Sequence, residues 1–288
     1  MTVLLAGATG TLGRELAAEL AKRGESVRAL VRSETRAATL TTLPAQLVVA
    51  DLATDDGDLD AACRGVDTVI SVAGRSCSTA RLPDRRRFRP VDLDGNRRLL
   101  EAAVKAGVAR FLYVSVLNAH RLRGLEYVDA HEEFVQLLQA SPLQSTVVRA
   151  NGFFAGFQEI LPLIDSPGPV PLIGHGHAKD NPIHEADLAV ACLEALEAAR
   201  SEVDVGGPET FTRRQELELA FQAAGRRPRI IAVPPRLFRA GAAALRPLDA
   251  RRAEVLKFVA EIGTTDMIGP PSGEHTLKDY LASLVDGR

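Results

Sequence analysis

The stretch that decides the fold is Gly7-Ala8-Thr9-Gly10-Thr11-Leu12-Gly13, which follows a short apolar run and opens a segment of helical period. Glycines spaced GxxGxxG between a strand and a helix are typical of a turn that wraps a pyrophosphate. Gly7 permits the tight turn, Gly10 lets the backbone approach the phosphates, and Gly13 lets helix and strand pack closely. The helix start adds unpaired N–H groups and a positive dipole end. We therefore predict a dinucleotide-binding turn made of Gly7, Thr9, Gly10, Thr11, Leu12 and Gly13.

Around this turn, the first half of the chain alternates short apolar or β-branched runs with longer segments of helical period. This alternation is typical of right-handed βαβ units that build a parallel sheet. Gly24, Gly65 and Gly107 stand where three of the helices should end. The pattern predicts a doubly wound α/β sheet of the Rossmann type. Its strands are expected at Val3–Ala6, Ser26–Val31, Gln46–Ala50, Thr68–Val72, Phe111–Ser115 and Ser145–Arg149, and its helices at Leu12–Arg23, Asp58–Cys63, Leu93–Ala106 and Tyr127–Ala140.

After Arg149 the composition shifts to glycine and proline and the regular alternation ends. We expect a Rossmann core over residues 1–150 and a substrate-side region over residues 151–288, packed on the same core as one compact unit. The predicted elements of the second part are a helix at Glu185–Ala199, a strand at Glu202–Val205, a helix at Arg213–Ala224, a strand at Arg229–Val233 and C-terminal helices.

Charge and composition narrow the class of partner. The 288 residues carry 35 basic and 37 acidic side chains, so the net charge of -2 creates no global field for nucleic acid or an anionic membrane. We expect a small-molecule substrate, with any electrostatic selection being local. The three cysteines show no CxxC spacing, and the first apolar run is too short to span a bilayer. These features favour an untargeted protein of the reducing cytoplasm and leave its oligomeric state open.

The end of the second predicted strand indicates which dinucleotide is preferred. An NAD-selective site usually has an acidic residue there, whereas this chain has Arg32, with Arg36 one helical turn further on. A guanidinium can pair bidentately with a 2′-phosphate, so the site is predicted to favour NADP(H) over NAD(H). The alternative is that Arg32 is solvated or stacks on the adenine. Two further loops suit the cofactor: Asp51-Leu52 beside the adenine and Ala73-Gly74 beside the ribose.

Several phrases in this order resemble the atypical short-chain dehydrogenase/reductase family, in its NmrA-like and NAD-dependent epimerase/dehydratase-like branch. The resemblance covers nearly the whole chain and implies a nicotinamide cofactor along the carboxyl ends of the strands. It does not by itself define a reaction. The phrases are GATGTLG, ALVRS, VVADL, VDLDGNRRLLEAAVKAGVARFLYVS, STVVRANGFF, NPIHEADLAVACLEAL and VGGPETFT.

The resemblance also implies a catalytic pair. Short-chain reductases use a YxxxK motif, and the matching positions here are Tyr127 and His131, which a spacing of four places on one helix face. Histidine in place of lysine alters the chemistry, because a neutral imidazole lowers the pKa of a tyrosine less and holds a ribose less well. Ser115 and Asn118 match residues that orient the substrate carbonyl, although Ser115 can equally end a strand. Ser115, His131, Asn151 and Phe153 are also expected to border the cofactor.

Three hypotheses follow. The first is an NADP(H)-dependent reductase of a carbonyl or activated double bond, with Tyr127 as proton donor. The second is a non-catalytic NmrA-like sensor that reports the NADP(H) state to a protein partner, suggested by the missing lysine. The third is a nucleotide-sugar epimerase or dehydratase, which the arginine-rich loop 81–89 would serve, although a solvated loop is the better interpretation of that segment. We expect no metal site at His175, His177 and His184, whose spacing matches no ligand motif.

Overall fold

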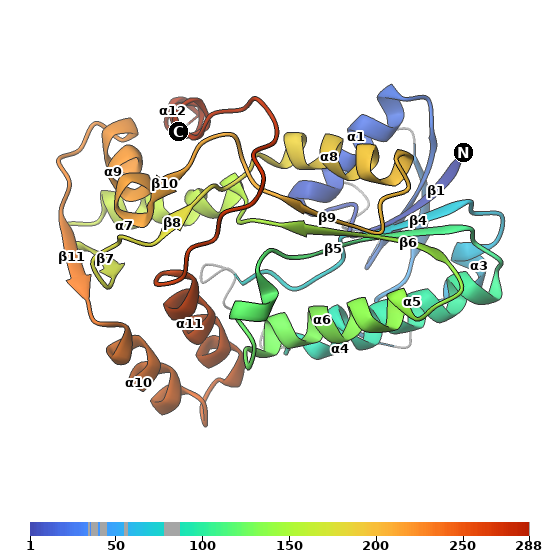
Figure 1. The fold of residues 1–288 in the computed structure, drawn as a ribbon, viewed down its shortest axis with the longest axis horizontal. Coiled ribbons are helices and arrows are strands. Elements are labelled where there is room, and N and C mark those ends of the chain that lie inside the picture. The colour runs from blue at the N-terminus through green and yellow to red at the C-terminus, as the bar shows by residue number, and fades with distance from the viewer. Residues whose placement is uncertain (34, 36–39, 41–44, 55–56, 78–86, 288) are drawn as a thin grey trace.

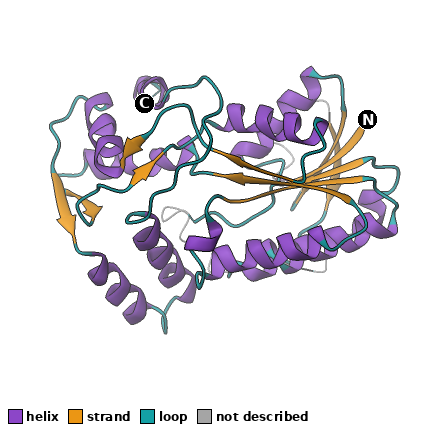
Figure 2. Ribbon diagram, viewed as in Figure 1, coloured by secondary structure: helices purple, strands orange, loops and turns teal. Residues whose placement is uncertain are grey.

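A parallel sheet of seven strands runs through the centre of the molecule (Figures 1 and 2). The computed structural model describes residues 1–33, 35, 40, 45–54, 57–77 and 87–287. The strand order is β3-β2-β1-β4-β5-β6-β9, so the order reverses beside β1, where β4 joins it on the other side. The strands are β1 (Thr2–Ala6), β2 (Ser26–Val31), β3 (Ala45–Val49), β4 (Thr68–Ser71), β5 (Arg110–Val116), β6 (Gln144–Ala150) and β9 (Glu202–Val205). This confirms the doubly wound Rossmann fold.

The register brings the carboxyl ends of the central strands to one level. Ala6, the last residue of β1, pairs with Leu30 of β2 on one side and with Ser71 of β4 on the other. In an open α/β sheet, ligands bind outside the carboxyl ends of the strands at the point where the strand order reverses. The loops after β1, β2 and β4 therefore meet where a dinucleotide site is expected.

Helices cover both faces of the sheet (Figure 1). Successive residues of β1 point to opposite faces, and Val3, Leu4 and Leu5 are fully buried, as expected for a strand enclosed on both sides. Val3 and Leu5 pack against α1 (Thr11–Lys22) and α8 (Glu185–Glu197), and Leu4 packs against the opposite helices. Those opposite helices are α3 (Leu59–Cys63), α5 (Asp94–Lys105) and α6 (Glu126–Gln139).

The second half of the chain gathers beyond the end of β6 (Figure 1). Its own apolar cluster includes Phe154, Leu217, Phe221 and Leu281. Two elements of this half nevertheless belong with the sheet, since β9 pairs with β6 and α8 packs on α1. The remaining elements are η3 (Phe154–Glu159), α7 (Ile160–Asp165), β7 (Val170–Ile173), β8 (Lys179–Asp180), β10 (Phe211–Thr212), α9 (Arg213–Ala223), β11 (Ile230–Val233), α10 (Pro235–Leu245), α11 (Ala250–Ile262) and α12 (Leu277–Asp286).

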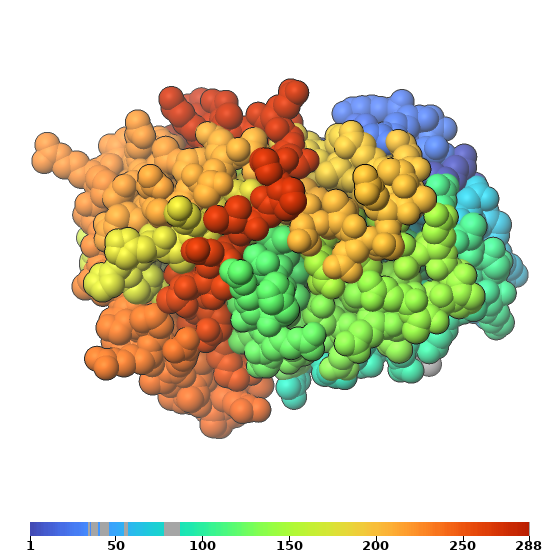
Figure 3. Space-filling view, in the orientation of Figure 1, coloured from blue at the N-terminus to red at the C-terminus, as the bar shows by residue number. Residues whose placement is uncertain are grey.

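The segment between α11 and α12 crosses the face of the molecule shown in Figure 3, where it appears in red. Met267 exchanges backbone hydrogen bonds with the strand that contains Lys179 and with Asn181. Further along, Asp187 of α8 accepts hydrogen bonds from the backbone of Glu274 and His275. The segment therefore joins α11 and α12 to the body of the fold.

The helix predicted at Leu93–Ala106 is confirmed as α5 within one residue at each end, but the short α4 (Arg89–Asp92) that precedes it was not expected, and Leu93 (φ -108°, ψ -66°) separates the two. Strands β7, β8 and β10 were not expected, since they have two to four residues and depend on pairing with distant segments. The predicted glycine stops are confirmed: Gly24, Gly65 and Gly107 all have positive φ. No helix within the described residues is long and apolar enough to cross a membrane.

Candidate functional site: a dinucleotide turn beside a buried histidine

The glycine turn is built so that side chains would not fit. Gly7 has φ +88°, and a Cβ on it would lie 2.8 Å from the backbone of Val72 and Ala73, in the loop after β4. A Cβ on Gly13 would lie 2.1 Å from the carbonyl oxygen of Gly7. Gly10 is the extended N-cap of α1, whose first turn holds no acidic residue. The turn thus brings bare backbone and a helix N-terminus together.

The other residues of the turn are placed around this backbone. The carbonyl oxygen of Thr9 accepts a hydrogen bond from the Arg14 guanidinium at 3.1 Å. Thr11 lies close to Glu185 at the start of α8 and lowers the pKa of that carboxyl, although burial raises it overall. Leu12 is buried. The turn thus lies against α8, and the backbone of Thr9 is held by Arg14.

The residues expected near the adenine follow β2 and β3. Arg32 comes directly after β2 and is exposed, while Arg36 lies outside the described residues. The Asp51 carboxylate accepts a hydrogen bond from the backbone of Ala53 at 2.9 Å, so it closes its own turn. Leu52 is buried, and its carbonyl accepts a hydrogen bond from Arg98 of α5 at 2.5 Å.

The loop after β4 is held from behind by two polar side chains. Asn96 donates its amide to the carbonyl of Ala73 at 3.0 Å, and an Asp92 carboxylate oxygen accepts the Arg75 N–H at 3.0 Å. Between them, a Cβ on Gly74 would lie 2.9 Å from that same Asp92 oxygen and 3.9 Å from Cε1 of His131. Any side chain at position 74 would therefore displace the Asp92–His131 pair.

His131 is enclosed behind this loop. Its Nδ1 lies 2.7 Å from the Tyr113 hydroxyl, and its Nε2 lies 3.3 Å from Oδ1 of Asp92. Its side chain is 7% exposed and that of Asp92 is fully buried. The resemblance implied that this position would serve Tyr127 and the ribose. In the structure Nδ1 is hydrogen-bonded to Tyr113, whereas Nε2 lies near Asp92 without a hydrogen bond to any described residue. The sequence analysis selected neither Asp92 nor Tyr113.

Tyr127 lies where the sheet-side helices meet α11. Its ring makes edge contacts with Phe88, His131 and Phe258, at centroid distances of 5.3, 4.6 and 5.2 Å. Burial raises the pKa of its phenol well above the usual 10, and the nearby Cys77 and Asp92 raise it further. Its hydroxyl has no hydrogen-bond partner among the described residues. The phenol therefore stays protonated, and its hydroxyl is not committed to another described residue.

The remaining predicted residues are placed apart from this phenol or are engaged elsewhere. Ser115 donates its hydroxyl to Glu132 at 3.0 Å, and Arg149 donates to the same Glu132 oxygen at 2.6 Å. Asn118 has a left-handed backbone (φ 52°) at the start of η2 (Ala119–Arg121). Phe153 is half-buried and forms a bridge to Ile183.

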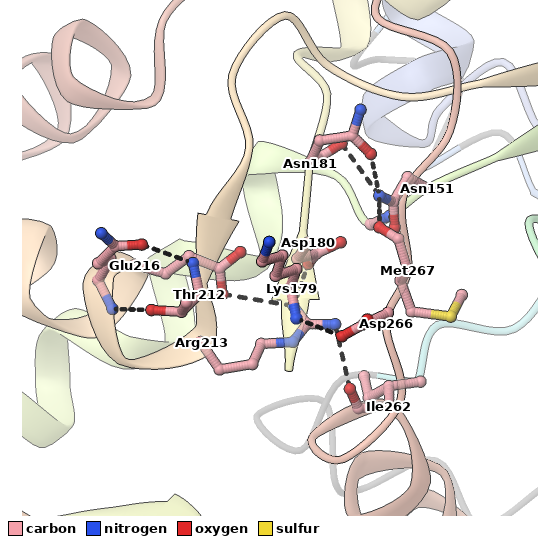
Figure 4. Close-up of polar contacts among 12 residues, drawn as sticks. Asn151, Lys179, Asp180, Asn181, Thr212, Arg213, Glu216, Ile262, Asp266 and Met267 are labelled. Carbon is pink, nitrogen blue, oxygen red and sulfur yellow. Dashed lines mark hydrogen bonds and ion pairs between the residues drawn. The ribbon is translucent and has the colours of Figure 1, made fainter. Parts of the chain in front are cut away.

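Asn151 is also committed to the fold (Figure 4). Its amide donates to the carbonyl of Asn181 at 3.0 Å, to the Asn181 side chain at 2.9 Å and to the carbonyl of Met267 at 2.6 Å. These bonds join the end of β6 to the segment after α11. They account for the N–H groups that a cofactor would otherwise use.

A buried charge cluster fixes the end of α11 (Figure 4). The Arg213 guanidinium is paired with Asp180 and Glu216, and it also donates to the carbonyl of Ile262 at 3.3 Å. Burial raises the pKa of Glu216 to about 8, and the Asp180 carboxylate adds to this rise, while Arg213 opposes it. Because α11 also carries Phe258, the cluster helps to set the wall against which Tyr127 packs.

No sequence motif marks the site residues that the sequence analysis did not select. Tyr113 stands in the apolar strand FLYVSV and Asp92 in a stretch of helical period, 18 and 39 positions from His131. Asp180, Arg213 and Glu216 are likewise brought together from two elements. A polar residue within an apolar stretch of sequence indicates a buried hydrogen bond, but the sequence does not show which residue is its partner.

Comparison with known proteins identifies the family to which the chain belongs. The family model described as NAD(P)H-binding matches residues 7–199, beginning at the first glycine of the turn. The photosystem II assembly factor Ycf39 of Guillardia theta is 29% identical over 242 residues, covering 82% of this chain and 74% of that protein. The uncharacterized sugar epimerase YhfK of Bacillus subtilis is 35% identical over 158 residues, covering 53% of this chain and 72% of that protein.

Among solved structures, the NADPH-dependent quinone oxidoreductase QOR2 of Escherichia coli, complexed with NADPH, superposes with a TM-score of 0.70 at 23% identity. The match covers 98% of this chain and 99% of that one. A nucleoside-diphosphate-sugar epimerase of Staphylococcus aureus gives a TM-score of 0.75 at 17% identity, covering 98% and 100%. These likenesses confirm the fold, and the match of the family model over two thirds of the chain confirms the resemblance: the chain belongs to the NAD(P)H-binding family of Rossmann-fold proteins.

Proposed function

We propose that the chain is an NADP(H)-dependent oxidoreductase that reduces a carbonyl or activated double bond of a small organic molecule. The observation that carries this proposal is the Tyr127 hydroxyl, which has no hydrogen-bond partner within the described residues and stands at the position of the family's tyrosine. Burial raises the pKa of this phenol, so it stays protonated and is a weak acid until substrate or cofactor binds beside it. Tyr127 lies against α11, and the resemblance places the nicotinamide along the carboxyl ends of the strands.

The cofactor side of the proposal rests on the fit of the turn. The space above Gly7, Gly10 and Gly13 is backbone-lined, and α1 presents its N-terminus there without a competing carboxylate in its first turn. Arg32, exposed at the end of β2, supports NADP(H), because a guanidinium can bind the 2′-phosphate bidentately. The relatives include proteins seen with NADPH and with NAD, so the preference is a proposal of its own.

The chain's own residues then have separate tasks. The bound nicotinamide supplies a hydride. Tyr127 donates the phenolic proton, so that the carbonyl carbon gains the hydride and the oxygen gains the proton. His131 acts as a positioning residue: its ring supports that of Tyr127 and also backs Gly74. Asp92 and Tyr113 orient the imidazole from behind.

The test uses purified protein, NADPH and a panel of aldehydes, ketones, enones and quinones. Tyr127→Phe should lower kcat by about 10²–10⁴-fold, the range typical of a lost general acid, and should leave the Kd for NADPH unchanged. Tyr280→Phe, on the half-buried Tyr280 that accepts a hydrogen bond from Gln158, is the matched control and should retain full activity. Unimpaired turnover by Tyr127→Phe would exclude the assignment.

A second function, a non-catalytic NADP(H)-binding regulator, is favoured by the enclosure of His131. With Nδ1 bonded to Tyr113 and the side chain 7% exposed behind Gly74, the residue at the family's lysine position is enclosed in the fold. The relatives include an assembly factor as well as reductases. This function predicts NADPH binding without turnover over the whole panel, together with a protein partner whose affinity changes when NADPH is added.

A further inference from the structure

The near-neutral charge of the whole chain conceals one strongly basic segment. We define the arginine arm as residues 226–248, which contain β11 and α10. The arm has six arginines and no aspartate, glutamate or lysine. All its other residues are apolar, glycine or proline, so it has no hydroxyl, amide or imidazole side chain. Such a composition is typical of helices that lie in the interface of a membrane.

The arm also contains the three most exposed large apolar side chains in the described part of the protein. Leu248 is 79% exposed, Leu237 58% and Ile231 50%, the three highest values among large hydrophobic residues there. β11 and α10 follow one another along one outer edge of the molecule (Figures 1 and 3), so these side chains belong to one rim. Within α10 only Ala242 is buried, on the side that packs against α11.

The arginines of the arm divide into two groups. Arg229 donates to the carbonyls of Ile164, Ser166 and Pro167, and Arg239 pairs with Glu261 at 2.8 Å, so these two fasten the arm to the fold. The side chains of Arg226, Arg227, Arg236 and Arg246 form no ion pair or hydrogen bond with any described residue. Arg246, at the end of the arm, lines a surface pocket that also contains acidic residues such as Glu126 and Glu254, whereas the arm itself contributes no acid.

We propose that the arginine arm docks the protein onto an anionic lipid surface. Arginine binds lipid phosphates while its apolar stem and the leucines reach the acyl boundary, and neither contact needs a neutral polar side chain. A typical protein interface uses about ten hydrogen bonds, whereas the arm has no neutral polar side chain and a single aromatic residue, the half-buried Phe238. The net charge predicted no attraction to an anionic membrane, and this docking would depend on local charge alone. Docking here would place α11 beside the membrane. Because Phe258 of α11 packs on the Tyr127 ring, the proposed active site would lie close to the lipid surface.

The first experiment is co-sedimentation of the full chain with vesicles of phosphatidylcholine alone or mixed with an equal part of phosphatidylglycerol. We expect binding to the mixed vesicles at low salt, weakening with added salt because screening shortens the reach of the guanidiniums. A variant with Gln in place of Arg226, Arg227, Arg236 and Arg246 should bind the mixed vesicles at least about tenfold more weakly. Each of the four arginines then contributes a modest share of the binding free energy. The same change at Arg64, Arg97, Arg123 and Arg200, exposed elsewhere, should have less than about a third of this effect.

The second experiment uses the absence of tryptophan from the sequence. Leu248→Trp creates a single fluorophore on the arm, and Leu163→Trp creates one on the 48%-exposed Leu163 of α7 as a control. With mixed vesicles the emission at position 248 should shift to the blue and that at position 163 should not. The proposal is overturned if the protein does not bind the mixed vesicles at low salt, or if both arginine variants lose binding equally. It is also overturned if the emission of Trp at position 248 does not shift to the blue when the protein is bound. Self-association or binding to an acidic protein without vesicle binding would likewise overturn it. None of these outcomes depends on reductase activity.

Discussion

His131 is hydrogen-bonded to Tyr113, whose hydroxyl lies 2.7 Å from Nδ1, although Tyr127 is the tyrosine four positions before it on the same helix. The contact between His131 and Tyr127 is one of ring edges, at a centroid distance of 4.6 Å. The residue at the family's lysine position is therefore turned toward the sheet. It organises the floor of the site and supports Tyr127 through packing.

This relationship predicts the effect of Tyr113→Phe. Removing the hydroxyl leaves Nδ1 of a 7%-exposed histidine without its partner, which should lower the free energy of unfolding by about 1–3 kcal/mol. Urea unfolding monitored by circular dichroism measures the change. Tyr280→Phe removes a hydroxyl that accepts from Gln158 at a half-buried site, and it should cost less than about 1 kcal/mol. Equal losses in the two variants would show that the Tyr113 bond has no special role.

How much of the fold the sequence predicts depends on the length of each element. The six strands expected in the first half are present within one or two residues, because each is a short apolar or β-branched run, although the edge strand β3 leaves Leu47 and Val49 about half exposed. The helix expected at Leu93–Ala106 is likewise present as Asp94–Lys105, whereas Arg89–Asp92 was not predicted, because four residues are too few to show a helical period. β8 has two residues and is stabilised by Phe211 and Thr212, about thirty positions away.

The turn itself predicts the behaviour of Gly13→Ala. The added methyl would lie 2.1 Å from the Gly7 oxygen, so helix α1 or the turn must move. We expect a loss of about 1–3 kcal/mol in the free energy of unfolding, as for other overpacked sites, and at least a tenfold rise in the Kd for NADPH. A thermal-shift titration with NADPH measures the loss of stability and the weaker binding together, and calorimetry checks the Kd.

Gly241→Ala is the matched control for that substitution. Gly241 is in the middle of α10 with no atom within 4 Å of an added Cβ, so alanine should stabilise the protein by up to about 1 kcal/mol through helix propensity. Its Kd for NADPH should remain that of the parent. A Gly13→Ala protein with parental affinity would place the dinucleotide elsewhere.

Arg32→Ala tests the choice between the two dinucleotides. If Arg32 binds the 2′-phosphate, the variant should bind NADPH at least about tenfold more weakly, because a charge-assisted bidentate pair is lost, and should bind NADH as before. Arg64→Ala, on a side chain 72% exposed at the end of α3, should change neither affinity. Parallel losses for NADPH and NADH would instead indicate that Arg32 stacks on the adenine.

The site could be predicted from the sequence only where its residues are neighbours. The glycines and Arg32 depend on local backbone geometry and a fixed distance along one βαβ unit, so the motif names them directly. Tyr127 and His131 were named through spacing, but the direction of the imidazole depends on Asp92 and Tyr113, which belong to other elements. Asn151 shows the same limit, since its three acceptors come from Asn181 and Met267.

The last prediction concerns pH. Burial raises the pKa of Glu216 from 4.5 to about 8, so in the folded state this carboxyl keeps its proton where the unfolded chain has lost it. The folded state binds the extra proton between these two values, and stability must therefore fall as the pH rises through that window. The slope for one proton is about 1.4 kcal/mol per pH unit at its steepest, giving a total on the order of a few kcal/mol.

Urea unfolding at intervals from pH 5 to pH 8.5 measures this slope for the parent protein and for Glu216→Gln. The glutamine cannot ionise, so its curve should be flatter than the parental one across the window, and subtraction removes titrations common to both proteins. Glu133→Gln is the control, because Arg89 holds the pKa of that exposed carboxyl below its usual value and its titration is complete before the window begins. A parental curve that rises toward pH 8, or a Glu216→Gln curve parallel to it, would mean that Glu216 is already ionised beside Arg213.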